Sequence, residues 1–256
     1  MLSYGQSTFA IVLSLVAAIL TVALLNRFWP VENRKILNDV NAWQMGVLGT
    51  TYGVILGFML FTVWTDFRTA EIDVALETAS LLNIHHISGG LSTPQREAMR
   101  KLTMKYAYVE INEEWPAMQT QNESHAGGAV LRQMWQTLVA AQTRPSPDIN
   151  VMNHLATAMS NLAERRRLRQ EQHESKLPGV LWVLLITGGV LTVMSSCLLG
   201  NDKKWLHYCQ VMALTFLIAV TLATIADLAR PFEGAVAVQP TAVQRALTVM
   251  QEDATP

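Results

Sequence analysis

Charged residues are absent from four long stretches of this 256-residue chain. A helix needs about 20 apolar residues to cross the hydrocarbon core of a bilayer, where no water is present to satisfy the backbone. Uniform apolarity over such lengths excludes the alternating strands of a membrane barrel. The sequence therefore predicts four transmembrane helices, at Thr8 to Asn26, Ala42 to Thr65, Leu177 to Asn201 and Leu206 to Ala226.

Cysteine is also scarce, because the chain holds only Cys197 and Cys209. Both lie in predicted membrane helices, and they offer neither a disulfide framework nor the spacing of metal ligands. The adjacent residues His85 and His86 would point about 100 degrees apart on a helix, so they cannot hold one metal ion together. The formal net charge of −1 gives no sign of nucleic-acid binding. We expect no metal site, no cofactor and no nucleic-acid partner.

Enzyme motifs are missing as well. The chain has no His-Glu-x-x-His zinc motif, no Gly-x-Ser-x-Gly turn, no P-loop and no dinucleotide-binding glycine fingerprint. A hydrolase working inside the membrane would need polar residues that converge at depth, and the apolar stretches do not supply them. The sequence therefore favours a protein that is not an enzyme.

A long polar block separates the two pairs of apolar stretches. We assign residues 1–65 to a first transmembrane pair, 66–176 to a helical domain, 177–226 to a second pair and 227–256 to a turn and tail. No Lys or Arg precedes Arg27, so the first stretch lacks the basic region of a signal peptide and we expect a retained helix. Near the helix ends, the side of the polar block carries eight basic residues against five on the other side. This excess predicts that the block and both termini are cytoplasmic.

The polar block shows no sustained alternation of period two, so we predict an all-α fold throughout. The second crossing continues into the block as a helix, because no Pro or Gly interrupts it before Gly89 and Gly90. We expect helices at Asp66 to Ser88, at Thr93 to an interruption at Pro116, around Val130 to Leu138, and from Asp148 or Asn150 to Lys176, with a polar loop from Gln119 to Gly128.

Two groups of charges in this block have several interpretations. The basic cluster is read first as a solvated face, and alternatively as a site for anionic lipid head groups or a feature that concentrates anions at a pore mouth. The acidic group is read as a wet helix face, with a vestibule below a pore as the alternative. These groups are Arg165, Arg166, Arg167 and Arg169, and Glu71, Asp73 and Glu77.

The second crossing has two distinct faces. Glycines repeat every four residues on one of them, a pattern that lets membrane helices approach closely. The opposite face would line a narrow, mainly apolar constriction if several copies of this helix surrounded an axis. Alternatively, it packs against a sister helix or lipid. The glycine face holds Gly49, Gly53 and Gly57, and the opposite face holds Thr51, Ile55, Phe58 and Thr62.

Three segments carry a family resemblance: Asp227 to Gly234, Leu177 to Trp182, and the glycine-rich second crossing followed by Glu77. Together they resemble the bestrophin-like family of bacterial multi-pass membrane proteins. Bestrophins are oligomeric anion channels whose narrow neck is formed by apolar residues of the second crossing. Glu233 interrupts the family's Pro-Phe-Gly turn, and Ala235 to Val238 replace the acidic cluster of calcium-regulated members. Calcium gating is therefore not implied.

The resemblance implies a homo-oligomer, with a pentamer as one candidate, in the bacterial inner (plasma) membrane. Its partners would be further copies of itself, the lipid bilayer and an inorganic ion that permeates passively. By analogy an anion is favoured over a cation, with chloride as a candidate.

The segment after the last crossing contains Asp227, Arg230, Pro231 and Phe232. Asp227 and Arg230 are read as an ion pair, or Arg230 as facing a vestibule, and the Pro-Phe turn (residues 231–234) as docking the tail. The rival function is a non-conducting membrane scaffold or sensor whose cytoplasmic helices bind a partner.

Overall fold

In the computed structural model all regular elements of the described residues are helices, as the sequence predicts. These residues form two compact units. We call Met1–Asp66 with Lys176–Ala229 the membrane unit, and Phe67–Ser175 with Arg230–Pro256 the polar unit. The described residues are 4–120, 122, 124–142, 148–175, 177–234 and 236–253.

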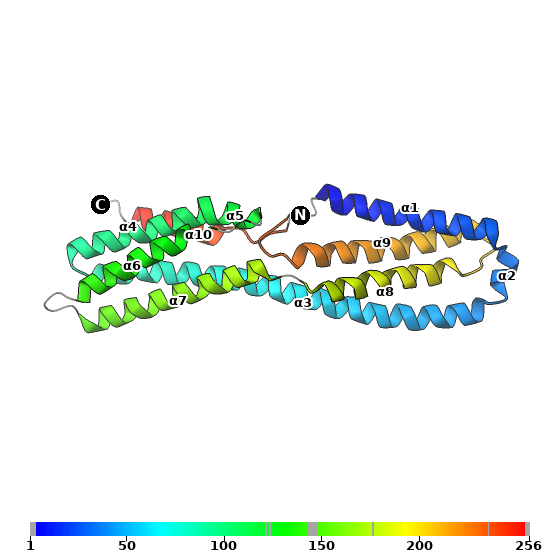
Figure 1. Cartoon of the computed structure of the whole chain (residues 1–256), viewed down its shortest axis with the longest axis horizontal. Helices are drawn as coiled ribbons and strands as arrows, with labels where there is room; N and C mark the ends of the chain where they lie inside the picture. The colour runs from blue at the N-terminus through cyan, green and yellow to red at the C-terminus, as the bar shows by residue number, and fades with distance from the viewer. Residues whose placement is uncertain are drawn as a thin grey trace. The chain divides into compact units, whose positions relative to one another are not determined.

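Among the described residues, four helices are long and apolar enough to cross a bilayer, and the membrane unit contains three of them and the first part of the fourth, α3 (Figure 1). Helix α1 packs along α9 and also contacts α8. At its core Ala18 and Val22 of α1 meet Cys197 and Val211. The four crossings are α1 (Tyr4–Phe28), the first part of α3 (Asn38–Ile87), α8 (Gly179–Cys197) and α9 (Lys204–Leu228), with the short α2 (Val31–Lys35) between the first two.

Hydrogen bonds tie the connection between α8 and α9 to the start of α3. Asn38 donates to the Gly200 carbonyl and accepts from the Gly200 N–H, both at 2.8 Å. A Cβ on Gly200 would lie 2.8 Å from the backbone nitrogen of Lys35, so only glycine fits this close approach. These contacts fix one end of the membrane unit.

The polar unit packs amphipathic helices around a core that includes Tyr106, Met134 and Leu155. Helix α4 lies against α6 and α10, and α6 contacts α7. The elements are the second part of α3, the 3₁₀ turn η1 (Ser88–Gly90), α4 (Thr93–Val109), the π-helical turn η2 (Glu110–Glu114), α5 (Trp115–Gln119), α6 (Ala126–Gln142), α7 (Ile149–Glu174) and α10 (Thr241–Glu252).

Several predicted helix boundaries are confirmed. Helix α3 runs without a break for 50 residues, so the second crossing does continue into the polar unit. Helix α4 begins at Thr93 with Pro94 in its first turn, and its N-cap is Ser92. Asp148 is the N-cap of α7, where its carboxylate accepts a hydrogen bond from the Asn150 N–H at 2.9 Å.

Two boundaries differ from the prediction. Pro116 does not break the chain's helical path, because the π-helical turn η2 comes before it and Pro116 lies in the first turn of α5. Helix α6 begins at Ala126, inside the predicted loop, and the Gly127 N–H there donates to Glu114 at 2.9 Å. Lys176, the predicted end of α7, lies outside the described residues.

Candidate functional site

The membrane part of α3 packs on its own unit by one face. Tyr52 and Val63 are buried on this face, and the Tyr52 hydroxyl donates to the Leu185 carbonyl of α8 at 2.7 Å. A Cβ on Gly188 would lie 2.6 Å from the Tyr52 ring, so the glycine allows the ring to approach α8. This face of α3 is therefore held by the rest of the chain.

The glycine face of α3 is open. A Cβ built at Gly49, Gly53 or Gly57 would meet no atom within 4 Å. The close helix packing that the glycine spacing predicts therefore has no partner among the described residues of one chain. It stays a prediction about a second copy.

The four predicted pore residues lie away from the face that Tyr52 anchors. Thr51, Phe58 and Thr62 are exposed, with Phe58 at 69%, and Ile55 is partly buried. The Thr62 hydroxyl donates to the Phe58 carbonyl at 2.9 Å, which satisfies it within its own helix. This surface is uncharged and available to another subunit or to lipid, and the pore assignment remains a prediction.

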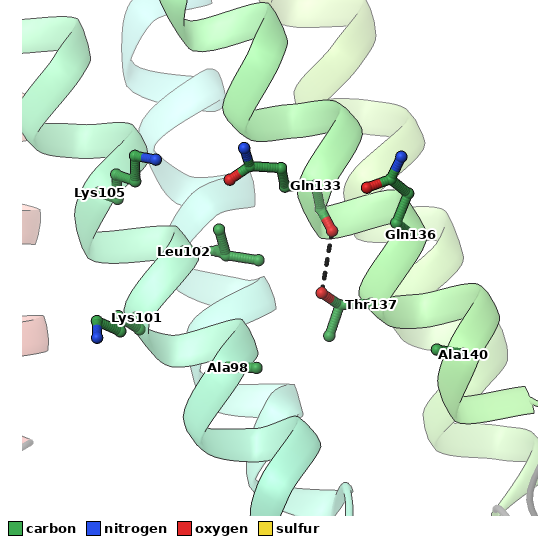
Figure 2. A pocket seen from close by; sticks show the side chains of 8 residues that line it. All are labelled: Ala98, Lys101, Leu102, Lys105, Gln133, Gln136, Thr137 and Ala140. Atoms are coloured by element: carbon green, nitrogen blue, oxygen red, sulfur yellow. Dashed lines mark hydrogen bonds between the residues drawn. The ribbon is translucent and has the colours of Figure 1, made fainter.

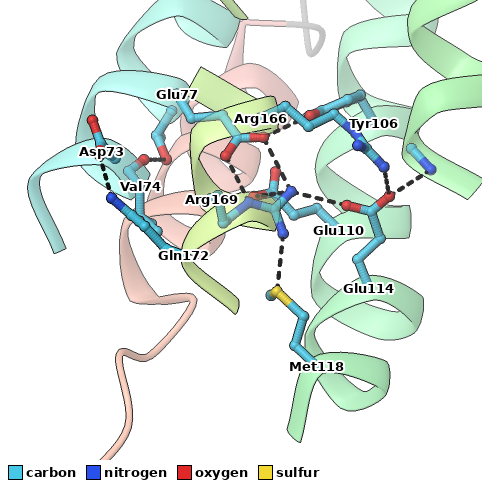
Figure 3. Close-up of polar contacts among 12 residues, drawn as sticks. Asp73, Val74, Glu77, Tyr106, Glu110, Glu114, Met118, Arg166, Arg169 and Gln172 are labelled. Atoms are coloured by element: carbon cyan, nitrogen blue, oxygen red, sulfur yellow. Dashed lines mark hydrogen bonds and ion pairs between the residues drawn. The ribbon is translucent and has the colours of Figure 1, made fainter. Parts of the chain in front are cut away.

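A buried network of charges occupies the interior of the polar unit (Figure 3). Arg169 is its centre, with a side chain only 1% exposed. Its Nε donates to Glu77 at 2.7 Å, and its Nη2 donates to Glu77 at 3.1 Å and to Glu114 at 2.9 Å. Arg166 also pairs with Glu114, and Glu110 lies 3.5 Å from Arg169 Nη2. Three separate elements, α3, η2 and α7, therefore meet at one ionic cluster.

Neutral groups complete the network. The Tyr106 hydroxyl donates to Glu77 at 2.6 Å, and burial raises the pKa of Tyr106 well above its ordinary value, so it remains a donor. Arg169 lies 5.5 Å from the centre of the Trp115 ring, within the range of a cation–π contact.

At the edge of the network, Asp73 accepts hydrogen bonds from Arg165 at 2.8 Å and from Gln172 at 2.7 Å.

This network corrects the reading of both charged groups as solvated faces. Arg166, Arg169, Asp73 and Glu77 are buried, and only Arg167 of the basic cluster is largely exposed, paired with Glu171. The sequence did contain a sign of this burial, because the charged residues lie at the same three- and four-residue spacing as the apolar residues of their helices. The apolar face of each helix therefore includes them: Ala70, Val74, Glu77, Leu81 and Ile84 on α3, and Leu155, Met159, Leu162, Arg166 and Arg169 on α7.

The Pro-Phe turn packs inside the polar unit. Phe232 is 1% exposed and meets the Trp115 ring edge-to-face at 6.0 Å, with the His173 ring at 6.5 Å. Trp115 also donates through Nε1 to the Val238 carbonyl at 3.1 Å. Gly234 follows with a φ of 80°, which glycine adopts without strain. The turn is thus anchored on the ring that stacks with Arg169.

The charged residues around the turn have separate environments. Arg230 lies 3.3 Å from a carboxylate oxygen of Glu233, which is itself buried. Asp227 is partly buried in the last turn of α9. Pro231 is buried next to Phe232. The vestibule role suggested for Glu77, Asp227 and Arg230 remains a prediction.

A groove of about 550 Å³ lies between α4 and α6 (Figure 2). Lys101 and Lys105 of α4 line one wall, and Gln133 and Thr137 of α6 line the other. The Thr137 hydroxyl donates to the Gln133 carbonyl of its own helix at 2.9 Å. None of the lining residues is buried, so the groove lacks the enclosed polar group that would mark a built ligand site.

Four apolar helices and a second helical unit with a buried ionic core define a multi-pass membrane protein. The bestrophin-like domain matches residues 12–243, which is most of the chain. The protein belongs to the bestrophin-like family, as the resemblance in its sequence predicts.

Solved structures share this fold. Two variants of a bacterial bestrophin homolog from Klebsiella pneumoniae match with TM-scores of 0.72 and 0.69, at 12% and 10% sequence identity. Each match covers 96% of this chain and 99% of the other. A membrane protein variant matches with a TM-score of 0.74 at 11% identity, covering 96% of this chain and 98% of that one. No curated protein matches the chain.

Proposed function

We propose that this protein is a homo-oligomeric ion channel that conducts passively. The observation that carries the proposal is the division of the membrane part of α3 into a held face and an open one. Tyr52 and Val63 anchor the helix to its own unit, while Thr51, Phe58 and Thr62 remain uncovered. A helix held in this way can present an uncharged surface to an axis shared with identical chains.

The chemistry of that surface suits a gate more than a binding site. Phe58 and Ile55 are apolar, and Thr62 has satisfied its hydroxyl within the helix. A ring of such side chains excludes water when it is narrow, so a hydrated ion meets an energetic barrier there. The open glycine face would allow the neighbouring subunit to approach closely.

We favour anions over cations as the permeant species. The support is the family, since the bestrophin-like family is associated with anion channels. Chloride is the first ion to test, and a pentamer is the first assembly to test. We further propose that the polar unit and both termini face the cytoplasm, in line with the excess of basic residues near the helix ends on that side.

The experiment is ion flux from proteoliposomes that contain the purified full-length chain. We expect chloride efflux in wild-type protein, and faster efflux in Ile55→Ala and Phe58→Ala. Removing part of an apolar constriction lowers the barrier, and about 1.4 kcal/mol of barrier corresponds to about tenfold in rate. A potassium gradient measured in the same vesicles reports the charge selectivity.

Phe216→Ala is the matched control, because Phe216 is an aromatic side chain on α9 that is 52% exposed. Its flux should equal that of wild type. Equal effects of Phe58→Ala and Phe216→Ala would contradict the pore assignment. Absence of any flux would contradict the channel and favour the scaffold, and preference for potassium would contradict the anion assignment alone.

A further inference from the structure

The buried network of the polar unit contains more acids than bases. Glu77, Glu110 and Glu114 contribute three carboxyl groups, and Arg166 and Arg169 contribute two guanidinium groups. All five side chains are at most 7% exposed. If every group were ionised, this interior would hold one uncompensated negative charge, which is costly away from water.

The three carboxyl groups are not equally provided with donors. Glu77 accepts hydrogen bonds from Tyr106 and Arg169, and Glu114 accepts from Arg166, Arg169 and the Gly127 N–H. Glu110 has only a longer approach of 3.5 Å to Arg169 Nη2. Its buried Oε1 accepts no hydrogen bond within the described part of the chain. Glu110 is therefore the carboxyl group that is worst suited to carry a charge.

Protonation of Glu110 balances the cluster. Two carboxylates then face two guanidinium groups, and each of these carboxylates has its own donors. Burial raises the pKa of Glu110 well above its ordinary value of 4.5, and the neighbouring charge of Glu77 raises it further. The positive charge of Arg169 acts in the opposite direction and does not reverse the shift.

The elements packed around Glu110 do not all contribute a charged or titratable group to the cluster. Helix α6 supplies a backbone N–H through Gly127, and Arg245 of the packed helix α10 is exposed. The groups that face the cluster are Glu77 of α3, Tyr106 of α4, Glu114 of η2, and Arg166 and Arg169 of α7.

Glu110 also begins the π-helical turn that leads directly to Trp115. The same Arg169 that approaches Glu110 stacks over the Trp115 ring, and that ring holds Phe232 and the Val238 carbonyl. A charge on Glu110 would draw Arg169 from Glu77 and Glu114 and disturb this stacking. This series of contacts links the protonation state of Glu110 to the packing of the Pro-Phe turn.

We propose that Glu110 holds a proton while the polar unit is folded at neutral pH, and that release of this proton loosens the Pro-Phe turn. This device makes the polar unit responsive to alkaline pH. It does not depend on whether the protein conducts ions.

The direction of the pH dependence follows from linkage. Glu110 has a folded pKa above its unfolded value, so between these two values the folded state holds more protons than the unfolded state. Stability of the polar unit therefore falls as pH rises through this window. The unfolding equilibrium constant should increase by up to about tenfold per pH unit, and level off above the folded pKa.

Infrared spectroscopy of the full-length protein in detergent at pH 7 tests the proton directly. Wild type should show the C=O stretch of a protonated, buried carboxyl group, and Glu110→Gln should lack it. Glu113→Gln is the matched control, since Glu113 is an exposed carboxylate of the same turn η2. A wild-type spectrum without the band, or a band that survives Glu110→Gln, would overturn the proposal.

Amide hydrogen exchange at residues 232–234 and 236–238 tests the consequence, after correction for the intrinsic pH dependence of exchange. Protection should decline with rising pH in wild type and stay constant in Glu110→Gln. The His173 imidazole contacts Phe232, so His173→Gln tests whether its titration causes the effect. This variant should still lose protection as pH rises. Loss of the decline in His173→Gln, or its persistence in Glu110→Gln, would contradict the assignment to Glu110.

Discussion

Each unit of the protein buries an arginine, and the two side chains have different partners. Arg34 of the membrane unit donates to the Cys197 carbonyl at the end of α8 at 3.1 Å and to the side chain of Asn26. Arg169 of the polar unit is surrounded by three carboxyl groups. The first charge is stabilised by carbonyl dipoles and the negative end of a helix, and the second by ion pairs.

This difference determines how each unit responds to change. Removing Arg34 leaves neutral acceptors without a donor, whereas removing Arg169 leaves the buried carboxylate of Glu77 without its counter-charge. Within the described part of the chain Arg34 donates to a backbone carbonyl and to a neutral amide, and neither of these acceptors titrates. The cluster around Arg169 contains several titratable groups, which places pH sensitivity in the polar unit.

The largest effect is expected from Arg169→Ala. Breaking a buried ion pair by removing one partner costs about 3–5 kcal/mol, because Glu77 would stay buried without its counter-charge while Glu114 would keep only Arg166. Hydrogen exchange in the polar unit measures this loss. Arg167→Ala removes an exposed arginine from the same helix and should change stability by less than about 1 kcal/mol. Similar losses in both variants would contradict the ionic core.

A smaller loss is expected from Arg34→Ala. Hydrogen bonds from a charged group contribute about 1.5–3 kcal/mol, and no carboxylate is orphaned here. Thermal unfolding in detergent at pH 6 and pH 9 measures both the loss and its pH dependence. The loss should be the same at the two pH values, and a strongly pH-dependent loss would show that the comparison with Arg169 is wrong.

Two glycine substitutions separate packing within one chain from packing between chains. Gly200→Ala places a Cβ 2.8 Å from the Lys35 backbone, and overpacking of this kind costs about 1–3 kcal/mol. In Gly53→Ala the new Cβ meets no described atom of its own chain within 4 Å, so protomer stability should be unchanged while subunit assembly weakens. Sedimentation of the detergent complex checks assembly, and an unaltered oligomer in Gly53→Ala would remove the glycine face from the interface.

The smallest effect is expected from Trp115→Phe. This change retains an aromatic ring against Phe232 but removes the N–H that donates to Val238, which is worth about 1 kcal/mol. Exchange protection at Val238 should fall while that of the α4–α6 packing is retained. Global loss of protection would mean that Trp115 supports the whole unit rather than the turn.

The sequence was sufficient for features that depend on local composition. The four crossings follow from the length of uncharged stretches, the continuation of α3 from the lack of Pro and Gly, and the start of α7 from Asp148. Each depends on residues close together in the chain. The family followed from short motifs spread along the chain, and the family match confirms it.

Features that depend on distant residues were harder to predict. Glu77 and Arg169 are 92 positions apart, and the composition of their two helices does not indicate that they pair. Their places within apolar stripes indicated burial, but a charge in a stripe can also end a helix's buried face. The helical continuation through Pro116 was also not predicted, because no pattern in the sequence indicates the π-helical turn that precedes it.

The most direct test of the channel account is a particle image of the full-length protein in detergent. We expect a ring of identical subunits with an axial passage, and α3 nearest to the axis with Phe58 facing it. A single subunit, or a ring in which the surface bearing Phe58 faces outward to lipid and no passage runs through the centre, would contradict the account.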